Sequence, residues 1–338
     1  MNTPVSPLII RRLGVAAVLY GLLIAGAQAA AGAPAVPTPP AAAPAPPAPP
    51  HTGYGRHGRY DDDNEDAGRP IDERRALKSD ARVHVSNVAG SIEIASWDKN
   101  EVYVTGELGQ GAEKLDISGS DSNLEIVVRT PKNSRNVSGT DLRIMLPVNT
   151  VLSIDAVSAD VVVQGIKGKV SAASVSGEVT LSLASDDVEA RSVSGDVVLR
   201  SPARNCVINT ISGDVRISGP SGKLRLETVS GDAELIGSGP FSEISLKSIS
   251  GDFDVDAALS GDGKLIGETL SGEMRVRLPT ATSALVTLHT FSGDVRSAFG
   301  ALAPPGEDRR ERQEFKIGDG RARVDLSSFS GDIRLEKR

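Results

Sequence analysis

Apolar and polar residues alternate with a period of two over most of residues 81–338, and one recurring phrase interrupts the alternation. The phrase reads Ser/Thr, apolar, Ser, Gly, Asp/Glu, apolar, any residue, apolar. Clear copies occupy residues 174–181, 192–199, 210–217, 228–235, 248–255, 269–276, 290–297 and 328–335, and degenerate copies occupy 87–94 and 156–163. From Ala159 onward, successive Gly-equivalent positions are 18, 18, 18, 18, 20, 21, 21 and 38 residues apart. A period in this range indicates a repeat architecture.

Within each repeat, apolar residues stand seven and five positions before the Gly and two and four positions after it. In the copy around Gly213 these residues are Cys206, Ile208, Val215 and Ile217. The position three before the Gly is Ser or Thr in all the clear copies. Period-two alternation on both sides of a Ser-Gly-acid turn is the pattern of half-buried strands. Each repeat therefore reads as strand, turn, strand and loop.

One such unit cannot bury its own apolar side, whereas stacked units can, and stacking also pairs the backbone groups of neighbouring units. The pattern predicts an all-β protein. Residues 152–338 are expected to form a parallel β-solenoid, right-handed, with two-strand rungs of 18–21 residues that stack about 4.8 Å apart. A meander of antiparallel hairpins is the alternative, but hairpins would not need the same turn residue at the same phase in every unit.

The alternation begins less regularly over residues 80–151. Val83 and Val85 take the seven-before and five-before positions relative to Gly90, but 69 residues separate Gly90 from Ala159. Terminal repeats are expected to be atypical. This segment is either a set of longer, irregular rungs or a small β cap, and both remain open. The charged finish at residues 335–338 fits an exposed end of the stack.

The chain opens with Arg11 and Arg12, an apolar run and the small-residue site Ala27-Gln28-Ala29. These features predict a secretory signal peptide over residues 1–29, cleaved after Ala29, and hence a periplasmic or secreted protein. An uncleaved membrane anchor is the alternative, and it is the one membrane attachment that we consider. Residues 30–79 are Ala- and Pro-rich and then charged, which predicts a disordered linker.

Loss of the signal peptide removes two positive charges and no negative ones, so the formal net charge goes from −7 to −9. An acidic chain without a basic stripe argues against a nucleic-acid partner and against binding to an anionic membrane surface. A single cysteine permits no intrachain disulfide. We expect a monomer without a cofactor.

The acid of each turn falls at the same phase of the repeat. We call this set the acidic column: Glu178, Asp196, Asp214, Asp232, Asp252, Glu273, Asp294 and Asp332. Carboxylates at rung spacing are suited to Ca²⁺, and Asp196, Asp214, Asp232 and Asp252 are the candidate ligands. The structural interpretation, which we favour, is that each carboxylate accepts hydrogen bonds from local turn N–H groups. We therefore expect no metal site.

No catalytic arrangement can be assembled from the remaining residues. Cys206 takes a slot that is Val, Leu or Ile in the other clear repeats, which predicts a buried thiol. His84 and His289 have the opposite parity to the apolar slots, and are expected to face outward on distant rungs. Aromatic residues make up 3% of the chain, few for the sugar-binding platforms of a polysaccharide-active β-helix enzyme. Such an enzyme is the alternative to a binding protein.

The loops that close the rungs vary in length, whereas the Ser-Gly-acid turns stay constant. The loop lengths run 6, 6, 6, 8, 9 and 9, and the loop at 298–323 has 26 residues. Because every insertion falls on one edge of the stack, the variable-loop edge is the expected partner surface.

Residues 87–98, 102–109, 142–170 and the repeats that follow resemble a bacterial extracytoplasmic family of β-strand repeats labelled "putative adhesin". The resemblance covers about residues 80–338 and includes GDGRARVDLSSFSGDIRL at 318–335. It implies a β-solenoid, no established enzymatic activity and a role in the cell envelope. Together with the residues, it favours a non-enzymatic envelope scaffold or binding protein whose partner is an envelope protein or glycan. A calcium-dependent binding module is a further alternative.

Overall fold

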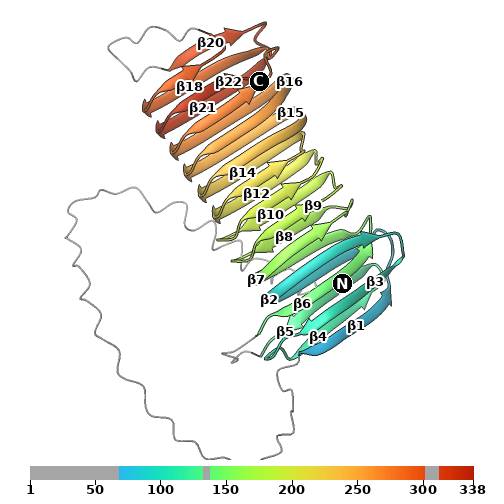
Figure 1. Cartoon of the computed structure of the whole chain (residues 1–338). Coiled ribbons are helices and arrows are strands. Elements are labelled where there is room, and N and C mark those ends of the chain that lie inside the picture. Colours follow the sequence, from blue (N-terminus) through green and yellow to red (C-terminus); the bar gives the residue numbers. More distant parts are fainter. Residues whose placement is uncertain (1–67, 132–137, 301–311) are drawn as a thin grey trace, which may run out of the picture. The chain divides into compact units, whose positions relative to one another are not determined.

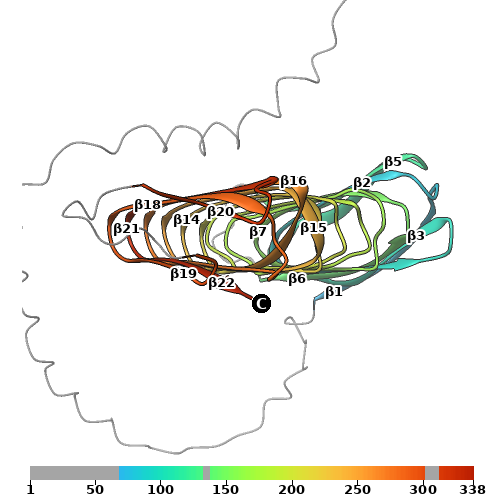
Figure 2. The same ribbon diagram turned by 90° about the horizontal axis from the view of Figure 1, so that it is seen from above.

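Two layers of strands face each other in the computed structural model of this chain, which describes residues 68–131, 138–300 and 312–338 (Figure 1). Strands that precede the Ser-Gly-acid turns lie in one layer, and strands that follow the turns lie in the other (Figure 2). Within these ranges all of the regular structure is strand, and no helix is long and apolar enough to cross a membrane. The predicted signal peptide and residues 30–67 of the predicted linker lie outside the described residues.

The regular rungs stack in parallel without a change of register. Val188 lies opposite Val170 on one side and Cys206 on the other, in the pre-turn layer. The parallel β-solenoid predicted from the repeat is therefore confirmed. Its strands are β7 (Val151–Gln164), β8 (Val170–Ser174), β9 (Val179–Ser182), β10 (Asp187–Ser192), β11 (Val197–Arg200), β12 (Asn205–Ser212), β13 (Val215–Ser218), β14 (Gly222–Ser230), β15 (Ala233–Ser250), β16 (Phe253–Ser271) and β17 (Met274–Leu278).

The inward side chains of both layers pack into one continuous core. The positions seven and five before each turn Gly are buried, as are nearly all of those two and four after it. Burial of each Val, Leu or Ile side chain contributes about 1.5–3 kcal/mol, so the stack is held by many small equal increments. The longer repeats take up their extra residues at the loop edge, where the pairing of β15 with β16 shifts register between Ile236 and Pro240 and again between Phe241 and Glu243. There Phe241 lies opposite Leu259 and is fully buried.

The N-terminal segment is partly solenoid and partly cap, so both of the alternatives left open apply to it. β2 forms a complete rung on β7, from Arg82 opposite Val151 to Ala95 opposite Gln164. β5 and β6 lie parallel to the other side of β2, and β1, β3 and β4 add to them in antiparallel fashion. The bounds are β1 (Arg69–Ala76), β2 (Arg82–Trp97), β3 (Glu101–Leu108), β4 (Lys114–Ser120), β5 (Asn123–Arg129) and β6 (Thr140–Pro147).

β1 corrects the boundary of the predicted linker, which was placed at residue 79. The strand is almost wholly polar, so its alternation gives no apolar signal. It is held instead by backbone pairing to β3 and by Arg74, whose guanidinium lies 4.0 Å from the centre of the Tyr103 ring. A polar strand of this kind covers an edge that would otherwise invite pairing with another chain.

The C-terminal rungs do not stack in chain order. The bounds are β18 (Ala284–Ser292), β19 (Val295–Ser297), β20 (Gln313–Ile317), β21 (Ala322–Ser330) and β22 (Ile333–Lys337). β21 lies between β16 and β18, and β22 lies between β17 and β19. β20 then covers the outer edge of β18 in antiparallel fashion. The last repeat of the chain is therefore the last but one in the stack (Figure 1).

The expected exposed end at residues 335–338 was thus wrong, and the reason lies in the preceding repeat. Its slot four after the Gly holds Ser297 where other repeats hold an aliphatic residue, and Val295 is only partly buried. The final repeat has Ile333 and Leu335 in these slots, both buried. The rung with the weaker core takes the end of the stack, with β20 on the outer edge of β18 and the following strand, β21, on its inner side.

Candidate functional site: the turn edge

The Ser-Gly-acid turns form one edge of the stack, which we call the turn edge. A buried hydroxyl closes the turn from inside. Ser174 Oγ accepts a hydrogen bond from the N–H of Gly177 at 3.0 Å and donates to the carbonyl of the same residue at 3.1 Å. Ser192 makes the same pair of bonds to Gly195. This position therefore caps the turn in these two repeats, and Thr210, Thr228 and Thr269 donate instead to the carbonyl of the Ser that precedes the Gly. Ser248 Oγ and Ser328 Oγ make no hydrogen bond to the described residues.

The turn Gly is required because the rungs approach each other closely through it. A Cβ on Gly195 would lie 2.1 Å from the carbonyl oxygen of Gly177 in the neighbouring rung. Gly213 has a φ of +121°, which L side chains rarely adopt, and a Cβ added there would lie 2.6 Å from the carbonyl oxygen of Gly195. The turn glycines therefore stack directly on one another, and the residues that precede and follow them form straight columns. The backbone conformation differs between turns, because φ is positive at Gly213 but not at Gly195.

The acidic column is a ladder of hydrogen bonds between rungs. In six cases the side-chain Oδ1 of an Asp accepts a hydrogen bond from the backbone N–H of the acidic residue in an adjacent rung. The donors and acceptors are Glu178 to Asp160 (2.9 Å), Asp214 to Asp196 (2.8 Å), Asp232 to Asp214 (3.1 Å), Asp252 to Asp232 (2.9 Å), Glu273 to Asp252 (2.7 Å) and Asp294 to Asp332 (2.9 Å).

The carboxylates thus bond to the N–H of an adjacent rung, whereas we expected local turn N–H groups. Parallel stacking sets the acid of one rung beside the backbone of the next, so its oxygen reaches the amide of that rung. The candidate calcium ligands Asp196, Asp214, Asp232 and Asp252 all belong to the ladder, and each uses one oxygen in it. The described residues hold no group of three or more His, Cys, Asp and Glu side chains arranged to hold a metal ion.

A row of apolar side chains, exposed except for the partly buried Val193, Ile211 and Val229, runs beside the ladder, two positions before each Gly. We call it the apolar column, and in stacking order it consists of Val88, Val157, Val175, Val193, Ile211, Val229, Ile249, Leu270, Phe329 and Phe291. Seven of the nine exposed large hydrophobic side chains among the described residues belong to it. Phe291 and Phe329 stack on each other with ring centres 4.9 Å apart and remain about half exposed.

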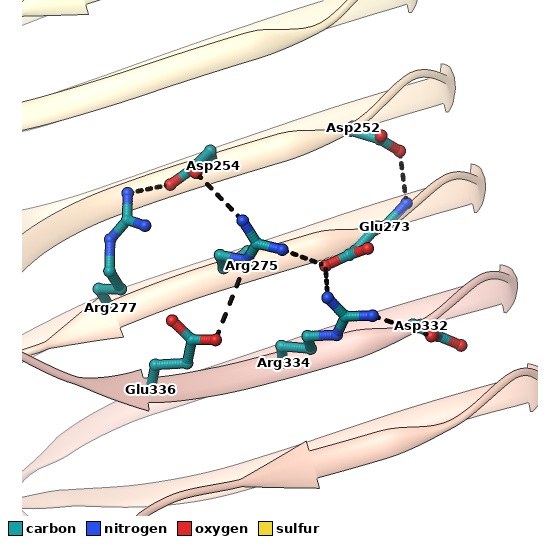
Figure 3. Close-up of polar contacts among 8 residues, drawn as sticks. All are labelled: Asp252, Asp254, Glu273, Arg275, Arg277, Asp332, Arg334 and Glu336. Carbon is teal, nitrogen blue, oxygen red and sulfur yellow. Dashed lines mark hydrogen bonds and ion pairs between the residues drawn. The ribbon is translucent and has the colours of Figure 1, made fainter.

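A network of arginines and carboxylates adjoins the turn edge at the C-terminal rungs (Figure 3). Arg334 on β22 reaches Glu273 at 2.9 Å and Asp332 at 3.5 Å. Arg275 on β17 reaches Glu273 at 3.1 Å, Asp254 at 3.8 Å and Glu336 at 3.9 Å. These partly exposed ion pairs cross three adjacent rungs, so they hold the inserted β22 against β17 and β16. We assign the network a structural role.

A shallow depression of about 350 Å³ lies beside the network, lined by residues that include Asp232, Asp252, Asp254, Glu273 and Arg275. Its acids outnumber its bases, and its walls are outward strand faces. The surface is open, and small-molecule sites are usually enclosed and largely apolar.

The other residues singled out from the sequence stay apart. Cys206 is 1% exposed, as predicted, and burial together with the nearby Asp187 raises the pKa of its thiol to about 12. His84 Nε2 lies 3.7 Å from Asp155 Oδ2 on the neighbouring rung. His289 is on β18, near the opposite end of the described stack. The structure therefore brings these three side chains into no common site.

The fold and its edge define a repeat protein of the β-solenoid class. The chain belongs to the family described as Toastrack DUF4097, which it matches over residues 73–336. The resemblance drawn from the repeats is confirmed by this match. No curated protein matches the chain.

Among solved structures, the chain is similar to a "putative adhesin" from Parabacteroides merdae ATCC 43184. The two are 11% identical, the match covers 80% of this chain and 97% of that one, and the TM-score is 0.42. It is also similar to a "putative adhesin" from Bacteroides fragilis NCTC 9343 (11% identity, coverage 80% and 98%, TM-score 0.35). A "putative lipid binding protein" from Parabacteroides distasonis ATCC 8503 is similar at 11% identity, with coverage of 79% and 97% and a TM-score of 0.33. At these identities the likeness concerns the fold alone.

The sequence analysis missed both the apolar column and the arginine network. The column has a clear signal, because its position lies at odd spacing from the buried slots on its own strand and must therefore face outward. The arginine network also has a signal in the sequence, because an Arg stands two residues after the turn acid in four repeats, at Arg216, Arg275, Arg296 and Arg334. What the sequence does not show is that Arg275 and Arg334 share Glu273, because that depends on the order of the rungs.

Proposed function

We propose that this chain is a non-enzymatic binding or scaffold protein of the cell envelope, and that its partner surface is the apolar column of the turn edge. The observation that carries the proposal is the concentration of exposed apolar side chains on this one edge. Contiguous exposed apolar surface on a soluble domain is typical of an interaction site. The described residues are also all-β repeats without an enclosed polar cleft, a form suited to presenting a long surface.

The variable-loop edge, which the sequence favoured, is the second candidate surface. Two exposed apolar side chains, Ile236 and Leu285, lie where strands meet that edge. These two side chains are on different rungs. At the same edge β15 pairs with β16, and this pairing buries Phe241. The turn edge therefore offers the more continuous apolar surface.

The envelope location rests on the predicted signal peptide, and the non-enzymatic role rests on the absence of a catalytic arrangement from the sequence. Fractionation of cells that produce the full chain tests the first. Incubation of the purified full chain with envelope polysaccharides, followed by an assay for new reducing ends, tests the second. Release of reducing ends above the level of a buffer control would favour the polysaccharide-active enzyme instead.

The binding surface is tested by recovery of partners from envelope extracts with matched variants of the full chain. Ile249→Ser together with Leu270→Ser alters the turn edge, and Ile236→Ser together with Leu285→Ser alters the loop edge. All four side chains are exposed, so both variants should fold. We expect partners to be lost with the turn-edge variant and kept with the loop-edge variant. The reverse result would assign the surface to the variable-loop edge.

A further inference from the structure

The five carboxylates Asp160, Glu178, Asp196, Asp232 and Asp252 form no ion pair with any described residue, although all of them lie on the turn edge. The other four acids of the column do form ion pairs. Asp214 pairs with Arg216, and the remaining three, Glu273, Asp294 and Asp332, pair with arginines of the C-terminal rungs. Uncompensated negative charge is therefore concentrated over the rungs from Ala159 to Gly251.

The same rungs carry the part of the apolar column from Val157 to Ile249. In each turn the acid follows the apolar side chain by three residues, so the anionic and apolar columns run side by side. The other flank of the apolar column is mixed in charge and locally paired. There Arg191 pairs with Glu189, and Lys247 pairs with Glu268 at 3.1 Å. The surface is thus apolar along its middle and anionic on one side only.

The spacing of the apolar column suits a helix better than a strand. Rungs repeat about every 4.8 Å, and a helix presents a side chain on one face about every 5.4 Å. A strand presents one on each face only about every 6.7 Å. The five steps from Val157 to Ile249 span about 24 Å, which is the length of a helix of about 16 residues.

From these observations we infer that the turn edge between Val157 and Ile249 binds a cationic amphipathic α-helix of a partner polypeptide. The apolar stripe of the helix lies on the apolar column, and lysines or arginines on one flank face the five unpaired carboxylates. Docking of an amphipathic helix on an apolar surface is a common recognition mode. Charge complementarity on one flank fixes the direction and rotation of the helix. This inference rests on the proposed binding function and specifies the partner's chemistry.

The probe is a fluorescein-labelled peptide of about 18 residues with a leucine stripe at helical spacing and lysines on one flank. A matched peptide carries glutamate in place of lysine. Fluorescence anisotropy measures binding to the full chain at low and at physiological salt. We expect the lysine peptide to bind, more weakly as salt is added, and the glutamate peptide not to bind.

Three variants locate the binding surface. Val157→Ser, Val175→Ser and Ile249→Ser combined should weaken binding of the lysine peptide by about tenfold or more, since about 25 cal/mol is lost per Å² of apolar contact. Asp196→Asn, Asp232→Asn and Asp252→Asn combined keep the acceptor oxygens of the ladder, and should reduce both affinity and salt dependence. Ile236→Ser with Leu285→Ser is the control and should leave binding unchanged. Circular dichroism of each variant checks that the fold is retained.

Equal binding of the glutamate peptide, or unchanged binding by the serine variant, would overturn the inference. So would self-association of the full chain, or binding to neutral phosphatidylcholine vesicles, that the serine variant abolishes, because the occupant would then be a second copy or a lipid surface. In these cases the proposed function would still hold if the turn-edge variant failed to recover partners from envelope extracts that wild type recovers. If the turn-edge variant recovered the same partners as wild type, the proposed function itself would be wrong.

Discussion

The side-chain Oδ1 of Asp214 accepts a hydrogen bond from the backbone N–H of Asp232, 3.1 Å away in the next rung. The N–H of Asp214 donates in turn to Oδ1 of Asp196 at 2.8 Å. The side chain of this Asp thus accepts a hydrogen bond from one neighbouring rung, and its backbone N–H donates a hydrogen bond to the other. The turn acids stabilise the stack through their acceptor oxygen, and this role does not require a negative charge.

The first prediction compares a turn Gly with a turn acid. Gly213→Val should lower the free energy of unfolding by about 1–3 kcal/mol, because it combines a disfavoured backbone conformation with a Cβ too close to the neighbouring carbonyl. Asp214→Asn should have a smaller effect, since the amide oxygen still accepts from Asp232 and the like-charge repulsion along the column falls. Urea unfolding followed by circular dichroism measures both. A larger loss for Asp214→Asn would show that the charge itself is needed.

The second prediction concerns calcium. The structural role of the column predicts a small rise in melting temperature with millimolar Ca²⁺, and the same rise with Mg²⁺ at equal ionic strength, because both ions screen the carboxylates. A ligand that binds only the folded chain would instead stabilise it by mass action. A large calcium-specific rise that disappears when Asp196, Asp214 and Asp232 are all changed to Asn would make this edge a calcium site.

The third prediction follows from the buried thiol. Burial first, and then Asp187, raises the pKa of Cys206 from 9.0 to about 12. Between these values the folded chain keeps the proton and the unfolded chain loses it. The contribution of the thiol to stability is therefore complete below pH 9 and falls as the pH rises toward 12.

Cys206→Val is the matched control, because Val fills the same slot at positions 170 and 188. Between pH 7 and pH 10, wild type should lose about 1 kcal/mol more unfolding free energy than the Val variant. Urea unfolding under reducing conditions at both pH values measures the difference. The same pH dependence in both proteins would mean that the thiol is not buried.

The fourth prediction tests the order of the C-terminal rungs. In a chain that ends at Gly300, β18 and β19 lose β20, β21 and β22, which are their pairing partners. Their amides should then exchange with solvent far faster, while β8 to β14 keep their protection, because rungs contact only their neighbours. Hydrogen exchange read by mass spectrometry gives both values. Protection of β18 in the shortened chain would show that it stacks directly on β16.

Individual residues show how far the sequence could predict this structure. The slot of Cys206 and the register of the regular rungs follow from a strict period, because the side-chain direction alternates along a strand. The insertion of β22 could not be predicted, since Gly293 and Gly331 stand in nearly identical phrases and only Ser297 marks the weaker rung. β1 was missed because a polar edge strand has no apolar pattern. The bond between Asp214 and Asp232 depends on a neighbour that exists only after stacking.

Crosslinking in living cells distinguishes the turn edge from the loop edge as the interaction surface of this chain. A photoreactive amino acid replaces Val175 or Ile249 on the turn edge, and Ile236 or Leu285 at the loop edge, in the full chain. All four side chains are exposed to a similar degree, from 41% to 47%. We expect illumination to yield crosslinked adducts from the two turn-edge positions and not from the two loop-edge positions. Adducts from Ile236 and Leu285 alone would show that partners bind at the loop edge instead.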